Sequence, residues 1–216
     1  MTLRFHFHPL ASYCHKVLIA LYENDTAFEP HIVDLADPTA RAAFAALWPM
    51  AKMPVLRDDG RDETVAESSI IIEYLDQHHP GPTRFLPADP DQARRVRFWD
   101  RIFDNYVQDP MQRIVADRIR PADAGNDPFA VAQARGLLAT TYGMIEQELA
   151  GRTWAAGEAF TLADCSAAPA LFYADKVAPF GDDHPNIRDY FERLKARPSF
   201  ARVLREAEPY FAMFPQ

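Results

Sequence analysis

The N-terminal part of the chain changes between two hydrophobic periods. Leu3, Phe5 and Phe7 alternate with polar residues, and this period of two predicts a strand. Over residues 12–23 the apolar side chains fall at helical spacing, and residues 28–35 again have the pattern of a strand. A strand, a helix and a strand at this spacing predict a βαβ unit with a right-handed crossover.

The next segments extend this α/β pattern. Residues 38–47 are rich in alanine and predict a short helix. Residues 54–57 and 64–66 flank a turn and predict the two arms of a β-hairpin. Residues 67–79 follow with apolar side chains on one helical face, so we expect a helix that closes the domain.

A cluster of four prolines within eleven residues, from Pro80 to Pro90, predicts a linker with little regular structure. Beyond it every apolar pattern is helical. The expected helices cover residues 94–120, 129–149, 161–174, 186–196 and 199–207, with a kink near Asp109 because Pro110 follows it. The fold class is therefore α/β plus all-α, with an α/β domain at residues 1–80, a linker at 81–90 and an all-helical domain at 91–216.

The amino-acid composition and net charge exclude several classes of function. The 216 residues are 48% hydrophobic and 25% charged, as in a globular protein, and the net charge of −8 argues against nucleic acids and anionic membranes as partners. No segment approaches the roughly 18 apolar residues of a membrane helix. Cys14 and Cys165 have no metal-ligand or redox spacing, so we expect two reduced thiols, no metal and a cytoplasmic location.

The loop Ala11-Ser12-Tyr13-Cys14 lies between the first strand and the first helix. In a βαβ unit such a loop faces the ligand crevice, and the helix start carries free N–H groups. The Ser12 hydroxyl can donate to a bound thiolate and lower its pKa. The alternative is that Ser12 is an ordinary N-cap.

Two other loops carry candidate binding groups. If Pro54 is a cis-proline, the backbone of Met53 becomes an open pairing edge; a trans-proline would simply begin a strand. Glu67 and Ser68 stand at a predicted helix start. Together they suit the ammonium and carboxylate of an α-amino acid group, or they merely cap the helix and complement its dipole.

The Thr161-x-x-Asp164 pattern is a different kind of signal. Thr161 can cap the amide of Asp164 while the carboxylate of Asp164 reaches back, which is a capping box. We expect these two residues to fix a helix and to take no part in chemistry.

The order and spacing of these motifs resemble the cytosolic glutathione S-transferase family over essentially the whole chain. The resemblance rests on the first loop through Val17, on Met53-Pro54-Val55-Leu56, on Glu67-Ser68, on residues 160–164 and on the proline-rich linker. It implies a thioredoxin-like domain that binds glutathione and a helical domain that supplies the pocket of the second substrate. It also implies a homodimer.

The resemblance also implies a role for each matching position. Pro54 matches the family's cis-proline, and Met53 would pair its backbone with the cysteinyl part of glutathione. Glu67 and Ser68 would hold the γ-glutamyl end, and Lys52 would reach the glycyl carboxylate. The capping box at residues 161–164 matches the N-capping box of the family.

The first loop departs from the family pattern. Counted back from Val17, the usual serine or cysteine falls at Ala11, so Ser12 is the expected thiolate donor, and a backbone N–H at the helix start can share or replace that role. The same alignment places Cys14 on the inner cysteine of glutaredoxins, which disfavours thiol–disulfide exchange through an enzyme cysteine.

We therefore predict a glutathione transferase that acts in detoxification. In its reaction the thiolate of glutathione attacks an apolar electrophile. Candidates for the second-substrate pocket are Tyr13, Phe103, Tyr106, Val107 and Met111. One alternative keeps the glutathione site for an isomerase or dehalogenase reaction. The other is a non-catalytic binding or regulatory protein, which Ala11 favours and the intact glutathione motifs disfavour.

Overall fold

The N-terminal part of the chain folds around a four-stranded sheet with the strand order β2-β1-β3-β4. In this computed structural model, which describes residues 2–215, β1 (Leu3–Phe7) is parallel to β2 (Glu29–Ile32). β3 (Val55–Asp58) and β4 (Glu63–Ala66) form an antiparallel hairpin, and β3 also runs antiparallel to β1. The alternating residues of β1 are buried, as the period of two predicted.

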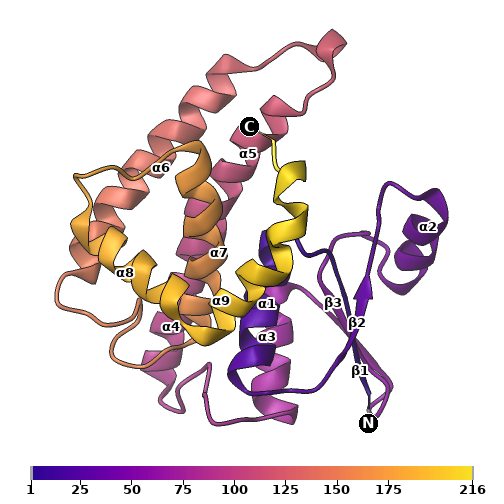
Figure 1. Cartoon of the computed structure of the whole chain (residues 1–216). Helices are drawn as coiled ribbons and strands as arrows, with labels where there is room; N and C mark the ends of the chain where they lie inside the picture. Colours follow the sequence, from indigo (N-terminus) through magenta and orange to yellow (C-terminus); the bar gives the residue numbers. More distant parts are fainter. Residues whose placement is uncertain (1, 216) are drawn as a thin grey trace.

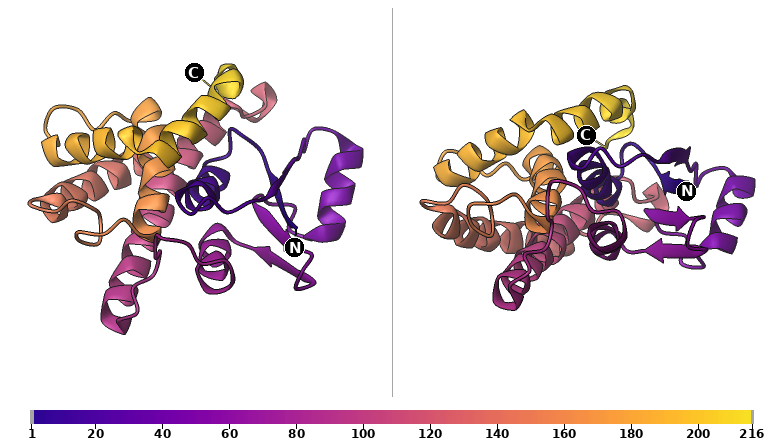
Figure 2. Two further views of the ribbon diagram at one scale, coloured as in Figure 1. Left: turned by 60° about the horizontal axis from the view of Figure 1, so that its bottom comes forward. Right: turned by 90° about the horizontal axis from the view of Figure 1, so that it is seen from below.

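Three helices complete this domain, α1 (Ser12–Glu23), α2 (Pro38–Leu47) and α3 (Ser68–His78). α2 lies on one side of the sheet, whereas α1 and α3 lie on the other side, between the sheet and the helical domain (Figures 1 and 2). α1 is consequently buried on nearly every side. This is the thioredoxin-like arrangement that the sequence predicted.

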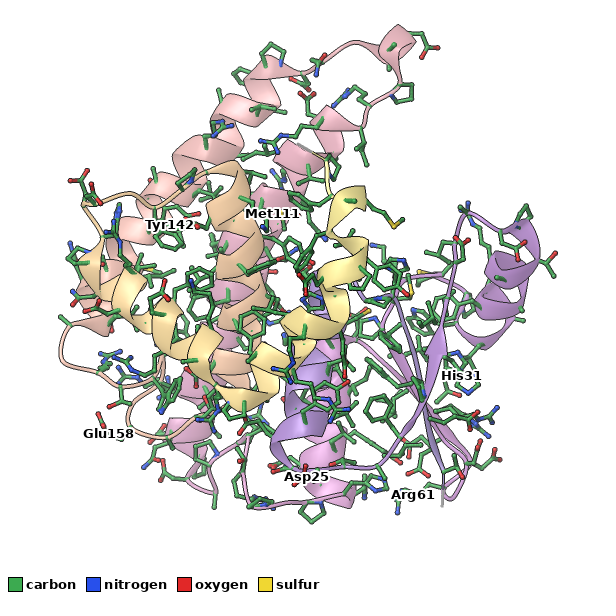
Figure 3. The ribbon with its side chains drawn as sticks, viewed as in Figure 1. Asp25, His31, Arg61, Met111, Tyr142 and Glu158 are labelled. Carbon is green, nitrogen blue, oxygen red and sulfur yellow. The ribbon has the colours of Figure 1, made fainter. Side chains whose placement is uncertain are left out.

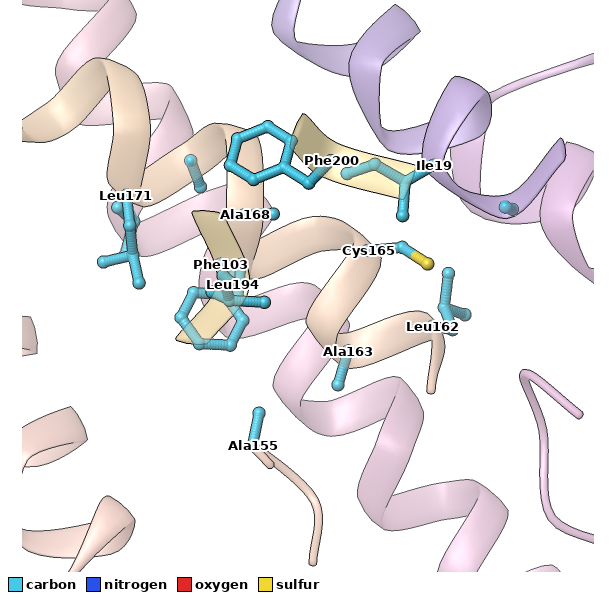
Figure 4. Packing of buried hydrophobic residues seen from close by; sticks show 14 of the residues in the cluster. Ile19, Phe103, Ala155, Leu162, Ala163, Cys165, Ala168, Leu171, Leu194 and Phe200 are labelled. Atoms are coloured by element: carbon cyan, nitrogen blue, oxygen red, sulfur yellow. The ribbon is translucent and has the colours of Figure 1, made fainter. Parts of the chain in front are cut away.

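The rest of the chain is helical. Its elements are α4 (Pro90–Ile102), the π-helix η1 (Phe103–Gln108), α5 (Asp109–Arg118), the short turn η2 (Ala122–Ala124), α6 (Pro128–Leu149), α7 (Leu162–Val177), α8 (Pro185–Ala196), α9 (Pro198–Ala207) and η3 (Glu208–Met213). α7 is buried along almost its whole length. It packs against α1, α4 and α8, and Figure 4 shows Cys165, Ala168 and Leu171 of α7 among the side chains of this core.

One local feature was not predicted from the sequence. In place of a single kinked helix over residues 94–120, a π-helical segment separates α4 from α5 directly before Pro110. Proline lacks an N–H and its ring clashes with the preceding turn, and a wider turn relieves that conflict. The wider turn also changes which side chains share a face on either side of it.

A buried charged cluster joins the two domains. The Lys16 ammonium on α1 lies 2.5 Å from the Asp100 carboxylate and 2.9 Å from that of Asp104, and all three side chains are almost fully buried. Ser166 of α7 donates a hydrogen bond to Asp100, and Lys16 donates one to Ser69 of α3. These contacts fix α1 and α3 against α4 and α7.

Across residues 2–215, none of the helices combines the length and the apolar character needed to cross a membrane. Within the same range, no three histidine, cysteine, aspartate or glutamate side chains gather as a metal site.

Candidate active site

A pocket of about 290 Å³ lies where the two domains meet. We call it the polar pocket. It is lined by Tyr13, Lys52, Met53, Pro54, Glu67 and Ser68 of the sheet domain and by Arg101, Asp104, Asn105, Asp109 and Gln112 of the helical domain. Three separate loops of the sheet domain therefore converge on one cavity, and charged side chains of both signs line it.

Met53 and Pro54 form one edge of the polar pocket, just before β3 begins. The peptide bond between them is cis, which is the conformation that the resemblance implied. Pro54 is buried and Met53 is half-buried, so the backbone of Met53 borders the cavity.

Glu67 forms a second edge of the polar pocket and is the N-cap residue of α3. Its φ of 68° lies in the left-handed region, which a residue with a Cβ adopts at a cost of about 1–3 kcal/mol. Ser68 follows as the first residue of α3 and is buried. A carboxylate, a hydroxyl and helix-start N–H groups thus meet at one point, a set that complements an α-amino acid group.

The helical wall of the polar pocket belongs to the buried charged cluster. Arg101 donates hydrogen bonds to Ser69 at 2.6 Å and to Asp104 at 2.5 Å. Burial raises the pKa of Asp104. At Asp100 burial acts in the same direction, but the charges and hydrogen bonds of Lys16, Ser166 and Arg101 together lower the pKa. Because Ser69 lies next to Ser68, this cluster holds the start of α3 in place.

A second pocket, of about 300 Å³, adjoins the first. We call it the apolar pocket. It is lined by Leu10, Ala11, Ser12, Gln108, Met111, Gln112, Val115, Ile119, Tyr173, Met213, Phe214 and Pro215. Gln112 lines both pockets, so they share a boundary at this residue.

The start of α1 stands at this boundary. Ala11 is the N-cap of α1 and its methyl group makes no capping hydrogen bond, so the N–H groups of the first helical turn lack a side-chain acceptor. Ser12 is 7% exposed and lines the apolar pocket. Cys14, one turn further, is fully buried, and burial raises the pKa of its thiol to about 12, so it stays protonated near neutral pH.

Comparison with known proteins matches both halves of the chain to one family. Residues 5–83 match the N-terminal domain of glutathione S-transferases and residues 128–193 match their C-terminal domain. The chain belongs to the glutathione S-transferase family.

Individual relatives of this family member cover nearly its full length. Glutathione S-transferase F13 of Arabidopsis thaliana is 28% identical over 94% of this chain and 95% of its own. FtsZ-localized protein A of Caulobacter vibrioides is 30% identical over 96% of this chain and 92% of its own. A crystal structure of a glutathione S-transferase from Methylobacillus flagellatus with glutathione bound is 25% identical, with a TM-score of 0.85 over 94% of this chain and 98% of that one.

Six glutathione-binding residues were predicted from the sequence of this glutathione S-transferase family member. The structure brings five of them together. Lys52, Met53, Pro54, Glu67 and Ser68 all line the polar pocket. Ser12 does not line it, although its neighbour Tyr13 does. Ser12 instead lines the apolar pocket, on the other side of the boundary between the two pockets.

The residues expected for the second substrate are more scattered. Met111 lines the apolar pocket, whereas Tyr13 lines the polar one. Phe103 and Val107 must be removed from the candidate pocket because both are fully buried in the core. Tyr106 is 44% exposed and lines neither pocket. All three residues belong to the π-helix, whose other residues Asp104, Asn105 and Gln108 line the two pockets instead.

Sequence reasoning missed one stripe of the apolar pocket. Gln108, Gln112, Val115 and Ile119 line it at steps of three or four residues, which is the spacing of one helical face. That periodicity was visible in the sequence, but it belongs to a register that starts at Gln108, the last residue of the π-helix. Figure 3 shows Met111 on this part of the helical domain.

Thr161 and Asp164 form a capping box at the start of α7. The buried Asp164 carboxylate accepts hydrogen bonds from the Thr161 amide at 2.8 Å and from its hydroxyl at 3.1 Å. It also accepts from the Ala155 amide and the Tyr190 hydroxyl. This carboxylate is therefore committed to structure and lines neither pocket.

Proposed function

We propose that this protein binds glutathione in the polar pocket and transfers it to an electrophilic carbon of an apolar small molecule held in the apolar pocket. The observation that carries the proposal is the shared boundary of the two pockets at Gln112, with the start of α1 beside it. A thiol at this boundary has hydrogen-bond donors on one side and an apolar cavity on the other.

The charges of the polar pocket suit the two ends of glutathione. The Glu67 carboxylate accepts from the γ-glutamyl ammonium, and Ser68 with the first amides of α3 donates to the γ-glutamyl carboxylate. The backbone of Met53 pairs with the cysteinyl amide, and the Lys52 ammonium attracts the glycyl carboxylate. This order of contacts extends the peptide across the pocket and brings its sulfur toward α1.

The chemistry follows from that placement. The Ser12 hydroxyl and the uncapped amides of α1 donate to the sulfur, which favours the thiolate over the thiol. The thiolate forms a carbon–sulfur bond with the electrophile, and the electron pair of the broken bond leaves with the departing group or moves into a neighbouring double bond. The nucleophile comes from glutathione, because the Cys14 thiol is buried and protonated.

Calorimetric titration of glutathione into the wild type and Glu67→Gln tests this site. We expect wild-type binding and a loss of about tenfold or more in the variant, because a charge-assisted contact becomes a neutral one. Glu73→Gln is the matched control, since Glu73 pairs with Arg97 on the outer side of α3 and lines neither pocket. Equal affinity of the wild type and Glu67→Gln would overturn the proposal.

A non-catalytic binding role is the second candidate. It is favoured by Ala11, which offers no hydroxyl or thiol at the helix start, and by similarity to a protein named FtsZ-localized protein A. Retention on immobilised glutathione combined with turnover of benzyl chloride separates the two. Retention without turnover of this or any other electrophile would favour the binding role.

The protein also forms a homodimer in this proposal, and it acts in the cytoplasm in detoxification. Support for the dimer comes from the family and from Ile70 of α3 and Phe98 of α4, which are 53% and 52% exposed. The Arg97–Glu73 pair joins the two helices beside these side chains. We expect sedimentation velocity to give a dimer for the wild type and a monomer for Phe98→Glu.

A further inference from the structure

Gln108 is a buried polar residue in the wall of the apolar pocket. It is the last residue of the π-helix η1 and is 2% exposed. Its amide nitrogen and its amide oxygen both lack a hydrogen-bond partner among residues 2–215. Buried amides are nearly always paired, so a residue that leaves both atoms unpaired at a cavity wall points to a partner supplied from the cavity.

The surroundings of Gln108 do not supply that partner. Met111 and Val115 present apolar groups to the same cavity, and the Tyr173 hydroxyl already donates to the carbonyl of Leu10 at 2.7 Å. Ser12 lines the same pocket and, in the proposed function, faces the sulfur. The Gln108 amide is thus unpaired within residues 2–215, in a residue that lines the wall of this pocket.

We propose that Gln108 is a specificity residue that selects electrophiles whose reacting carbon is conjugated to a carbonyl group. The inference rests on the proposed function, because it concerns the second substrate of that reaction. The Gln108 N–H donates to the carbonyl oxygen of the substrate, and rotation about the last side-chain bond exchanges its nitrogen and oxygen positions. A carbon-bound halogen is a much weaker acceptor and gains little from this amide.

In this reaction the Gln108 N–H donates to the carbonyl oxygen, which is the atom that gains negative charge. The glutathione thiolate adds to the β-carbon, the electron pair of the carbon–carbon double bond moves toward the α-carbon, and negative charge collects on the carbonyl oxygen. The Gln108 N–H stabilises that oxyanion in a cavity with few other donors. The α-carbon then takes a proton from water, so the addition has no leaving group.

The test compares two substrates that share a phenyl ring, benzylideneacetone and benzyl chloride, at saturating glutathione. We expect Gln108→Leu to lower the ratio of kcat/KM for benzylideneacetone to that for benzyl chloride about tenfold or more. Gln108→Glu, which keeps the shape but loses the N–H donor, lowers the same ratio. Gln133→Leu, the same substitution at an exposed position of α6, leaves the ratio at the wild-type value.

Two further measurements make every outcome decisive. The glutathione affinity of each variant, from calorimetry, reports whether the fold and the polar pocket are intact, and the thermal midpoint reports stability directly. An unchanged ratio in Gln108→Leu, or a wild type that turns over benzyl chloride but not benzylideneacetone, overturns the role of Gln108 and leaves the proposed function standing. A wild type that binds no glutathione overturns both.

Discussion

Ser12 and Tyr13 are consecutive residues at the start of α1, yet their side chains line different pockets. Successive side chains on a helix point about 100° apart, so one helix start serves both cavities. Ser12 lines the apolar pocket, and Tyr13 lines the polar one. In the proposed function, the sulfur of glutathione lies at the boundary between these two pockets.

The activating role of Ser12 can be measured as a rate. We expect Ser12→Ala to lower kcat/KM about tenfold to a hundredfold, because one donor to the thiolate is lost while the α1 amides remain. The double variant Ala11→Ser with Ser12→Ala moves the hydroxyl to the N-cap position and recovers part of the loss. Steady-state kinetics with benzyl chloride measure both effects, and a full wild-type rate in Ser12→Ala would contradict the assignment.

Backbone strain at Glu67 predicts that two substitutions which both weaken glutathione binding differ in stability. Glycine adopts the observed φ of 68° without strain. We therefore expect Glu67→Gly to have a free energy of unfolding about 1 kcal/mol higher than that of Glu67→Ala, measured by urea denaturation. Both variants lose the carboxylate and therefore bind glutathione more weakly than the wild type. Equal stability of the two variants would mean that the left-handed conformation at this residue costs nothing.

The buried cluster of Lys16, Asp100 and Asp104 predicts a large effect of one substitution. Lys16→Met leaves two buried carboxylates without their cation, so we expect a loss of about 3–5 kcal/mol in urea unfolding. Adding Asp104→Asn removes one of the stranded charges and recovers part of the loss. The control is Lys195→Met, whose ion pair with Glu192 is exposed and contributes about 0.5 kcal/mol or less.

Burial of His15 predicts a pH dependence of stability. Burial lowers the pKa of this imidazole from 6.5 to about 4, although its ring contacts the carbonyl of Pro9. The unfolded state binds the proton more tightly than the folded state. The free energy of unfolding is therefore highest above about pH 6.5, and it decreases by about 2–3 kcal/mol as the pH falls toward 4. Urea unfolding at several pH values should give a flatter profile for His15→Gln. Identical profiles would show that His15 does not titrate in this way.

The sequence was most informative where local periodicity and motifs agree with the fold. The pattern over residues 12–23 predicted α1 with its observed bounds, and the motifs around Met53, Glu67 and Thr161 predicted three helix or strand starts. In each case the signal lies within a few neighbouring residues. Tertiary packing then determines only how these loops approach one another.

The second-substrate pocket was harder to predict for a physical reason. A π-helix inserts a wider turn that apolar periodicity does not reveal, so Phe103 and Val107 lie in the core while Gln108 and Gln112 reach the cavity. The side of α1 on which Ser12 falls is likewise set by how the two domains pack. Neither feature is encoded in a short motif.

The ionisation of bound glutathione tests the central claim most directly. Thiolate absorbance is followed across pH for glutathione bound to the wild type and to Ser12→Ala, at concentrations that saturate both proteins. The account predicts that the thiol pKa falls below its reference value of about 8.5 in the wild type and returns part of the way in the variant. A bound thiol whose pKa in the wild type equals that of free glutathione would contradict the account.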